Sequence, residues 1–199
     1  MSVSNLQRQT LHSDATVGQP KVESARTALA RINPNVQFTL IDAMLDDDAL
    51  FAHIARHDLV LDCTDNFHTR QAINRACVTH HKPLVSGAVI QFDGQVAVYD
   101  LRHTESPCYA CVFPPDAAFE EARCATMGVF APLVGIIGAL QAAEALKLLA
   151  EVGTSLAGRL LMLDGRTMEW SAMQVARDSA CNVCSFSHNN HKLRDKPKL

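Results

Sequence analysis

Apolar and polar residues alternate along the chain with two periodicities, one typical of helices and one typical of strands. Apolar residues at helical spacing, or in one long run, predict helices at residues 21–32, 49–56, 68–81 and 129–150. Short apolar or alternating runs predict strands at residues 36–41, 58–63, 83–89 and 95–99. Asn33-Pro34 and Lys82-Pro83 mark the ends of the first and third helices.

The order of these elements predicts the fold class. Helices that alternate with strands indicate a parallel, doubly wound sheet. Residues 159–163 and 168–175 flank an Asp-Gly turn and predict a β-hairpin, which makes the complete sheet mixed. We therefore expect an α/β fold, a partial Rossmann-like domain over residues 1–184. The polar, net basic tail at residues 185–199 is expected to be disordered.

Composition narrows the class of protein. The 199 residues are 48% hydrophobic and 20% charged, which is typical of a soluble globular domain. A net charge of −3 argues against a general nucleic-acid binder. The polar first residues contain no secretory signal, and the apolar run at 129–143 contains Gln141 and precedes Glu144, so it predicts a buried helix rather than a membrane span. We expect a cytoplasmic protein with no nucleic-acid or membrane partner.

Two Cys-x-x-Cys pairs predict a metal site. They are Cys108 with Cys111 and Cys181 with Cys184. Two such pairs can complete a tetrahedral zinc site, and four thiolates leave no open position, so the zinc would be structural. The alternatives are two unrelated pairs or a thioredoxin-like redox pair.

Five segments form an ordered set that is more specific than any one of them. They are SNLQRQ at 4–9, VGQPK at 17–21, DCTDN at 62–66, MGVFAPLVG at 127–135 and LQAAEALK at 140–147. In order and spacing this set resembles the signature of the ubiquitin-activating-enzyme-like adenylyltransferases, the family of HesA, MoeB and ThiF. The resemblance covers nearly all of the chain up to Cys184.

Charged residues in these segments suit a magnesium nucleotide. Asp65 follows a predicted strand, at the edge where open α/β sheets bind ligands, and a carboxylate there can hold Mg²⁺. Arg8 and Lys21 suit phosphate oxygens. By resemblance, Ser4, Asn5, Gln9 and Asn66 line the same ATP pocket. The alternatives are a helix cap at Asp65 or Asn66 and solvated surface charges at Arg8 and Lys21.

Cys124 is a candidate nucleophile. It follows Arg123 and precedes the long helix, and both features can lower the pKa of a thiol. In some members of the resembled family a cysteine at this place takes the activated carrier covalently, whereas other members do not need it. The alternative is an idle thiol. Cys63 and Cys77 are interpreted as packing residues.

The resemblance implies a reaction and its partners. The implied reaction is ATP-dependent adenylation of the C-terminal glycine of a ubiquitin-like sulfur-carrier protein. The implied enzyme is a homodimer that acts in molybdenum cofactor or thiamine biosynthesis. Family members begin with a strand and a Gly-x-Gly-x-x-Gly turn, neither of which this sequence contains. Two hypotheses stay open: an N-terminally truncated adenylyltransferase, or a non-catalytic zinc-stabilised interaction module. The same missing motif disfavours a nicotinamide dehydrogenase.

Overall fold

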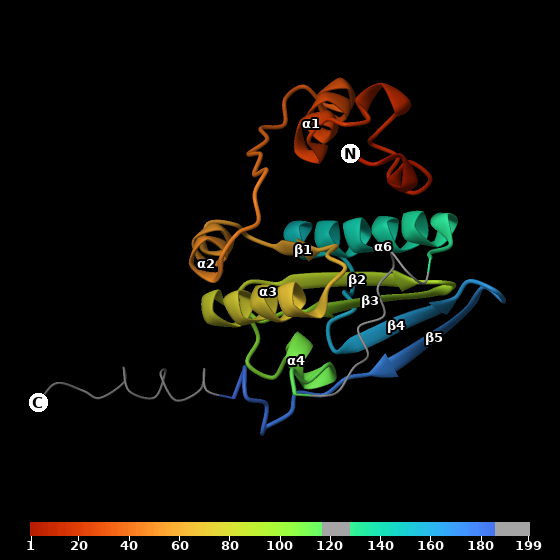
Figure 1. Cartoon of the computed structure of the whole chain (residues 1–199). Coiled ribbons are helices and arrows are strands. Elements are labelled where there is room, and N and C mark those ends of the chain that lie inside the picture. The colour runs from red at the N-terminus through yellow and green to blue at the C-terminus, as the bar shows by residue number, and fades with distance from the viewer. Residues whose placement is uncertain (117–127, 186–199) are drawn as a thin grey trace, which may run out of the picture. The chain divides into compact units, whose positions relative to one another are not determined.

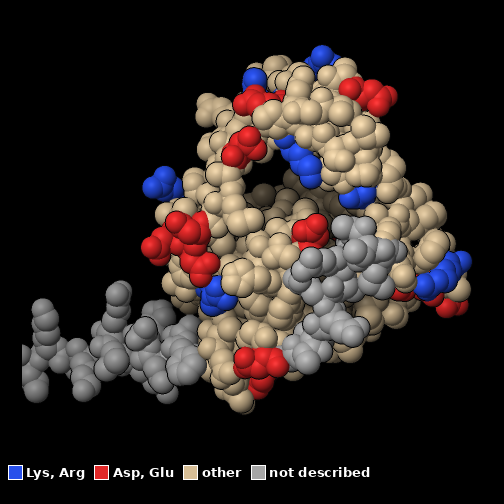
Figure 2. Space-filling view, in the orientation of Figure 1, with Lys and Arg blue, Asp and Glu red and all other residues tan. Residues whose placement is uncertain are grey.

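A computed structural model of the chain describes residues 1–116 and 128–185 (Figure 1). The chain divides into two units, Met1–Leu45 and Asp46–Leu199, and each is described by itself. On the face shown in Figure 2, the described Lys and Arg residues are dispersed among acidic ones, as the small net charge suggests.

The N-terminal unit holds the helix α1, Lys21–Ile32, with the bounds that the sequence predicts. Two short 3-10 turns, Val3–Asn5 and Asp14–Thr16, precede it. The imidazole of His12 hydrogen-bonds the buried hydroxyl of Ser24 at 2.7 Å and so holds this segment against α1.

The strand predicted at residues 36–41 is wrong, because the described backbone there has no regular secondary structure. A strand needs a neighbour for its ladder hydrogen bonds, and none of the described strands pairs with this segment. Alternation of apolar and polar residues alone therefore does not make a strand.

The second unit contains one five-stranded sheet. Its strands, in spatial order, are β1 (Val60–Asp62), β2 (Leu84–Ile90), β3 (Asp93–Tyr99), β4 (Arg159–Asp164) and β5 (Glu169–Gln174). β1 and β2 are parallel, and the other three pairs are antiparallel. The mixed sheet and the hairpin are thus confirmed. The expected parallel arrangement holds for β1 and β2, and it is wrong for β2 and β3, because the two residues that join these two strands permit only an antiparallel pair.

Helices cover both faces of the sheet. They are α2 (Asp47–Ala55), α3 (Phe67–His80), the short α4 (Tyr109–Val112) and α6 (Ala131–Ala150). Figure 1 shows α3 and α6 on opposite faces. Successive residues of β2 therefore face opposite sides of the sheet. Leu84 packs in the cluster that contains Ile73 of α3, and Val85 packs in the cluster that contains Leu148 of α6.

α6 is the described helix that is long and apolar enough to cross a membrane. Its residues Leu133, Ile137 and Leu148 are buried. The first two pack with Leu163 of β4, which fits a core helix of a sheet domain. This agrees with the buried helix predicted from the sequence.

Candidate nucleotide site and metal centre

The loop that follows β1 is built around a buried carboxylate. Asp62 is 1% exposed. One of its oxygens accepts hydrogen bonds from the backbone N–H of Thr64 at 2.9 Å and from the Thr64 hydroxyl at 2.7 Å. The other accepts from the Ser86 hydroxyl at 3.0 Å. Since both oxygens have partners, Asp62 supports the loop rather than offering a free ligand.

Asp65 lies in this loop, just beyond the C-terminal end of β1, and is exposed. The next residue, Asn66, is the N-cap of α3, and its side-chain oxygen accepts from the backbone N–H of Thr69 at 2.8 Å. Asn66 thus caps α3 through its side-chain oxygen, and its place in the ATP pocket stays a prediction. Asp65 remains accessible at the sheet edge where open α/β folds bind ligands.

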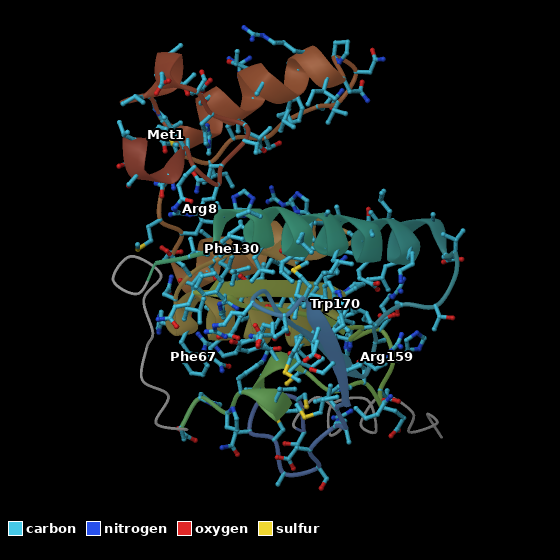
Figure 3. All side chains as sticks on the ribbon, turned by 90° about the vertical axis from the view of Figure 1, so that its right-hand side faces the viewer. Met1, Arg8, Phe67, Phe130, Arg159 and Trp170 are labelled. Atoms are coloured by element: carbon cyan, nitrogen blue, oxygen red, sulfur yellow. The ribbon has the colours of Figure 1, made fainter. Side chains whose placement is uncertain are left out.

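The N-terminal unit gathers a second part of the predicted site. The guanidinium of Arg8, labelled in Figure 3, donates to the backbone carbonyl of Ser4 at 3.2 Å and to the side-chain oxygen of Asn5. Lys21 is the first residue of α1, where the helix dipole favours anions. Gln9 carries a buried side-chain oxygen that has no hydrogen-bond partner within the described residues. An orphaned polar atom of this kind is compatible with a ligand-binding position.

The structure therefore brings Ser4, Asn5 and Arg8 together in one unit and places Asp65 in the other. The convergence of Arg8, Lys21 and Asp65 on one nucleotide stays a prediction. Cys124 lies outside the described residues, and its covalent role likewise stays a prediction.

Four cysteines converge beside α4, where the sulfur atoms gather in Figure 3. The sulfur of Cys108 lies 3.8 Å from that of Cys111 and 3.7 Å from that of Cys181, and the sulfurs of Cys111 and Cys184 are 3.5 Å apart. All four lie within 4.8 Å of one another. A tetrahedral site with metal–sulfur bonds of about 2.3 Å has its sulfurs about 3.8 Å apart, so these residues fit zinc. The alternative of two unrelated pairs is excluded.

Neighbouring groups hold the cluster. Asn74 of α3 donates to the sulfur of Cys108 at 3.6 Å and accepts from the backbone N–H of Tyr109 at 2.9 Å. The pKa of Cys111 is lowered because Cys108 and Cys184 hydrogen-bond its sulfur, with backbone N–H groups adding to this. A lowered pKa favours the thiolate, the form in which cysteine binds metal.

The other two described cysteines differ from each other. Cys77 is fully buried in the core, as expected for a packing residue, and burial followed by the charge of Asp62 raises its pKa to about 12. Cys63 is exposed, so the packing interpretation is wrong for it. β1 ends at Asp62, one residue before Cys63, and the Cys63 thiol donates to the side-chain oxygen of Gln141 at 3.6 Å.

Sequence reasoning missed two residues that hold the loop around Asp65. Gln141 of α6 is 5% exposed and Arg70 of α3 is 9% exposed, and both donate to backbone carbonyls of this region. Gln141 had a signal in the sequence, as a polar residue that interrupts the apolar run at 129–143. Arg70 had none, since an arginine on a helix is usually a surface residue.

Known proteins resemble the chain over almost all of its length. The model of the ThiF family matches residues 1–183. The chain is 54% identical over 187 residues to the molybdopterin-synthase adenylyltransferase of Salmonella typhimurium, covering 92% of this chain and 73% of that protein. It is 41% identical over 186 residues to the sulfur carrier protein ThiS adenylyltransferase of Escherichia coli, covering 94% of this chain and 73% of that protein.

A solved structure agrees on the fold. The crystal structure of E. coli MccB with ATP aligns with a TM-score of 0.79 at 20% identity, and covers 93% of this chain and 57% of that one. The chain thus spans about three-quarters of the length of these curated relatives and just over half of this solved chain. From the family match and the identities to its relatives, the chain belongs to the ThiF family.

Proposed function

We propose that the chain acts in the ATP-dependent adenylation of the C-terminal glycine of a ubiquitin-like sulfur-carrier protein. The observation that carries the proposal is an exposed carboxylate, Asp65, held at the ligand-binding edge of a ThiF-family sheet. Relatives at 41–54% identity are named for adenylating molybdopterin synthase and the ThiS carrier. Both names describe transfer of an adenylyl group to a protein.

The proposed reaction is an attack of the carrier's terminal carboxylate on the α-phosphate of ATP. A bond forms between a carboxylate oxygen and the α-phosphorus, the bond from that phosphorus to the bridging oxygen of the β-phosphate breaks, and pyrophosphate leaves. Arg8 and Lys21 stabilise the phosphate charge and orient the triphosphate. Asp65 would hold Mg²⁺, which neutralises phosphate charge when bound. Asn5, Ser4 and Gln9 would line the pocket beside Arg8.

The four-cysteine cluster would hold a structural zinc ion. Its thiolates fill all four tetrahedral positions, so no position is left for substrate. The site joins residues 108–111 to residues 181–184 and would stabilise the C-terminal part of the sheet domain.

The remaining parts of the proposal follow from the family resemblance. The carrier would be the small subunit of molybdopterin synthase or the ThiS type, in molybdenum cofactor or thiamine biosynthesis. The active form would be a cytoplasmic homodimer, and Cys124 would be its candidate covalent residue.

Carrier-dependent exchange of pyrophosphate into ATP tests the proposal. We expect the wild-type chain to catalyse exchange only when a carrier is present. Asp65→Asn should lower the rate at least about 100-fold, since it removes the ligand of a charge-neutralising metal. The matched control is Asp58→Asn, which changes an exposed aspartate just before the opposite end of β1.

Three outcomes separate the hypotheses. Exchange that falls with Asp65→Asn but not with Asp58→Asn supports the adenylation proposal. Exchange that is equally fast in Asp65→Asn refutes the role of this carboxylate. A chain that binds zinc and a carrier but shows no exchange would be the non-catalytic interaction module.

A further inference from the structure

One buried side chain of α6 joins the last residue of β1 to the second residue of β2. The amide nitrogen of Gln141 donates to the backbone carbonyl of Asp62 at 2.9 Å and to that of Val85 at 3.3 Å. Its amide oxygen accepts from the thiol of Cys63 at 3.6 Å. Both groups of this buried amide are therefore used to hold the C-terminal end of β1 against β2.

A glycine of β2 makes room for this arrangement. A Cβ atom on Gly87 would lie 2.4 Å from both Cδ and Oε1 of Gln141. Glycine in the middle of a strand weakens it and often marks a place where another group approaches closely. Here the close group is the Gln141 amide, so Gly87 and Gln141 depend on each other.

Arg70 of α3 holds the same loop. Its guanidinium donates to the backbone carbonyl of Thr64 and to that of Gly87 at 3.3 Å. Three successive residues at the end of β1 are thus fixed: Gln141 binds Asp62 and Cys63, and Arg70 binds Thr64. Asp65 comes next in the chain, and Asn66 is then fixed as the cap of α3. The loop leaves Asp65 exposed between anchored neighbours.

We infer that Gln141 is a positioning residue for Asp65, and that Gly87 is the small partner this role requires. The inference rests on the proposed function, because that function makes Asp65 the ligand of the magnesium ion bound with ATP. Mg²⁺ demands near-ideal geometry from its ligands, so the backbone that carries the carboxylate must be fixed before the nucleotide binds. Gln141 fixes it from within the core and does not itself touch the metal.

The test compares two buried glutamines. Gln71 of α3 is 4% exposed and donates to the backbone carbonyl of Phe113 at 2.7 Å, so its amide binds a residue outside the loop at residues 62–66. Gln141→Leu and Gln71→Leu each remove one buried amide donor of the same size. Both variants should therefore lower the melting temperature, and a merely structural role predicts no further difference between them.

The distinguishing readout is the gain in ATP affinity that magnesium provides, measured by calorimetry with and without Mg²⁺. For Gln141→Leu we expect this gain to fall by about 10-fold or more, the usual effect of removing a group that orients a metal ligand. ATP affinity without magnesium should stay the same. Gln71→Leu should keep the whole gain.

A second readout does not need nucleotide. Amide hydrogen exchange at residues 63–66 should become faster in Gln141→Leu and stay at the wild-type rate in Gln71→Leu. Gly87→Ala should reproduce both effects, because its methyl group would displace the Gln141 amide. If Gln141→Leu does not fold, Gln141→Asn keeps the amide, shortens its reach by one methylene and serves in its place.

The outcomes separate this inference from the proposed function. If magnesium raises the ATP affinity of the wild type and of Gln141→Leu equally, or if Gln71→Leu loses as much, the inference is overturned and the proposed function stands. If magnesium adds nothing to ATP binding by the wild type, the proposed function fails, and the inference fails with it.

Discussion

Three buried polar residues of the sheet domain, Glu144, Asn74 and Gln141, each have a specific partner. Glu144 of α6 is 4% exposed, accepts from the backbone N–H of Leu156 at 2.8 Å and pairs with Lys147 at 2.5 Å. Asn74 and Gln141 are satisfied in the same way by the cysteine cluster and by β1. The sequence predicts which side chains carry chemistry, since their spacing is local. It does not predict the hydrogen bonds from Glu144 to Leu156, from Asn74 to Cys108 and from Gln141 to Asp62, since each of them joins residues 12 or more positions apart.

Cys77 gives a prediction about pH. Its pKa is raised from 9.0 to about 12, chiefly by burial and then by the charge of Asp62. Below pH 9 both states keep the proton and the contribution to stability is constant. Between pH 9 and 12 the unfolded thiol ionises first, so the free energy of unfolding falls by about 1.4 kcal/mol per pH unit from this group.

Cys77→Ala should remove that part of the alkaline decline. Urea unfolding of both proteins from pH 8 to 10.5 measures it. The variant should be less stable at pH 8, because it leaves a small cavity, and the difference should shrink above pH 9. A difference that stays constant up to pH 10.5 would show that Cys77 does not titrate as its burial predicts.

Among the elements, those with strong periodicity could be predicted from the sequence. The ranges of α1, α3, α6 and the β4–β5 hairpin agree with the prediction to within about two residues, as is usual for helix ends. The strand expected at residues 36–41 failed because pairing is a property of two segments. The antiparallel order of β2 and β3 could have been predicted from their short connection.

Helix α6 allows a matched comparison of two leucines. Leu133 is fully buried, and its side chain lies 3.3 Å from where a Cβ on Gly94 or on Gly165 would be. Leu146 is 65% exposed. Leu133→Ala should lower the free energy of unfolding by about 2–5 kcal/mol, because the rigid sheet cannot fill the cavity. Leu146→Ala should change it by less than about 0.5 kcal/mol.

Denaturant titration of the two variants measures both values. The comparison is sharp because the residue type, the substitution and the helix are the same. Equal losses in the two variants would mean that α6 does not pack on β3 and β4 through Leu133.

At the scale of the whole molecule, the cysteine cluster joins segments that are 73 residues apart. Cys181→Ser should lower the zinc content below one ion per chain and lower the melting temperature, because a structural metal contributes its binding free energy to folding. Metal analysis and thermal denaturation measure this, with Cys63→Ser as the control outside the cluster. Unchanged zinc with intact stability in Cys181→Ser would remove the zinc assignment.

The cysteine cluster and the candidate nucleotide site differ in how far the sequence predicts them. The cysteine ligands could be predicted because each pair has the Cys-x-x-Cys spacing of metal ligands. The four sulfur atoms lie together, as this spacing predicts. Arg8 and Lys21 belong to one unit and Asp65 to the other. The order of the family segments predicts their common role, and measurements of ATP binding test it.

ATP binding by single and double variants is the most direct such measurement. Arg8→Ala and Lys21→Ala should each weaken ATP binding about tenfold or more with or without magnesium, since each removes a charge-assisted contact to phosphate. Asp65→Asn should weaken it only with magnesium. Arg31→Ala, at the exposed end of α1, is the control.

The double variant Arg8→Ala with Asp65→Asn decides whether the residues serve one nucleotide. In the presence of magnesium its loss of binding free energy should differ from the sum of the single losses, because groups that bind one ligand are coupled. Wild-type affinity in all three single variants, or losses that simply add, would contradict a shared site for Arg8, Lys21 and Asp65.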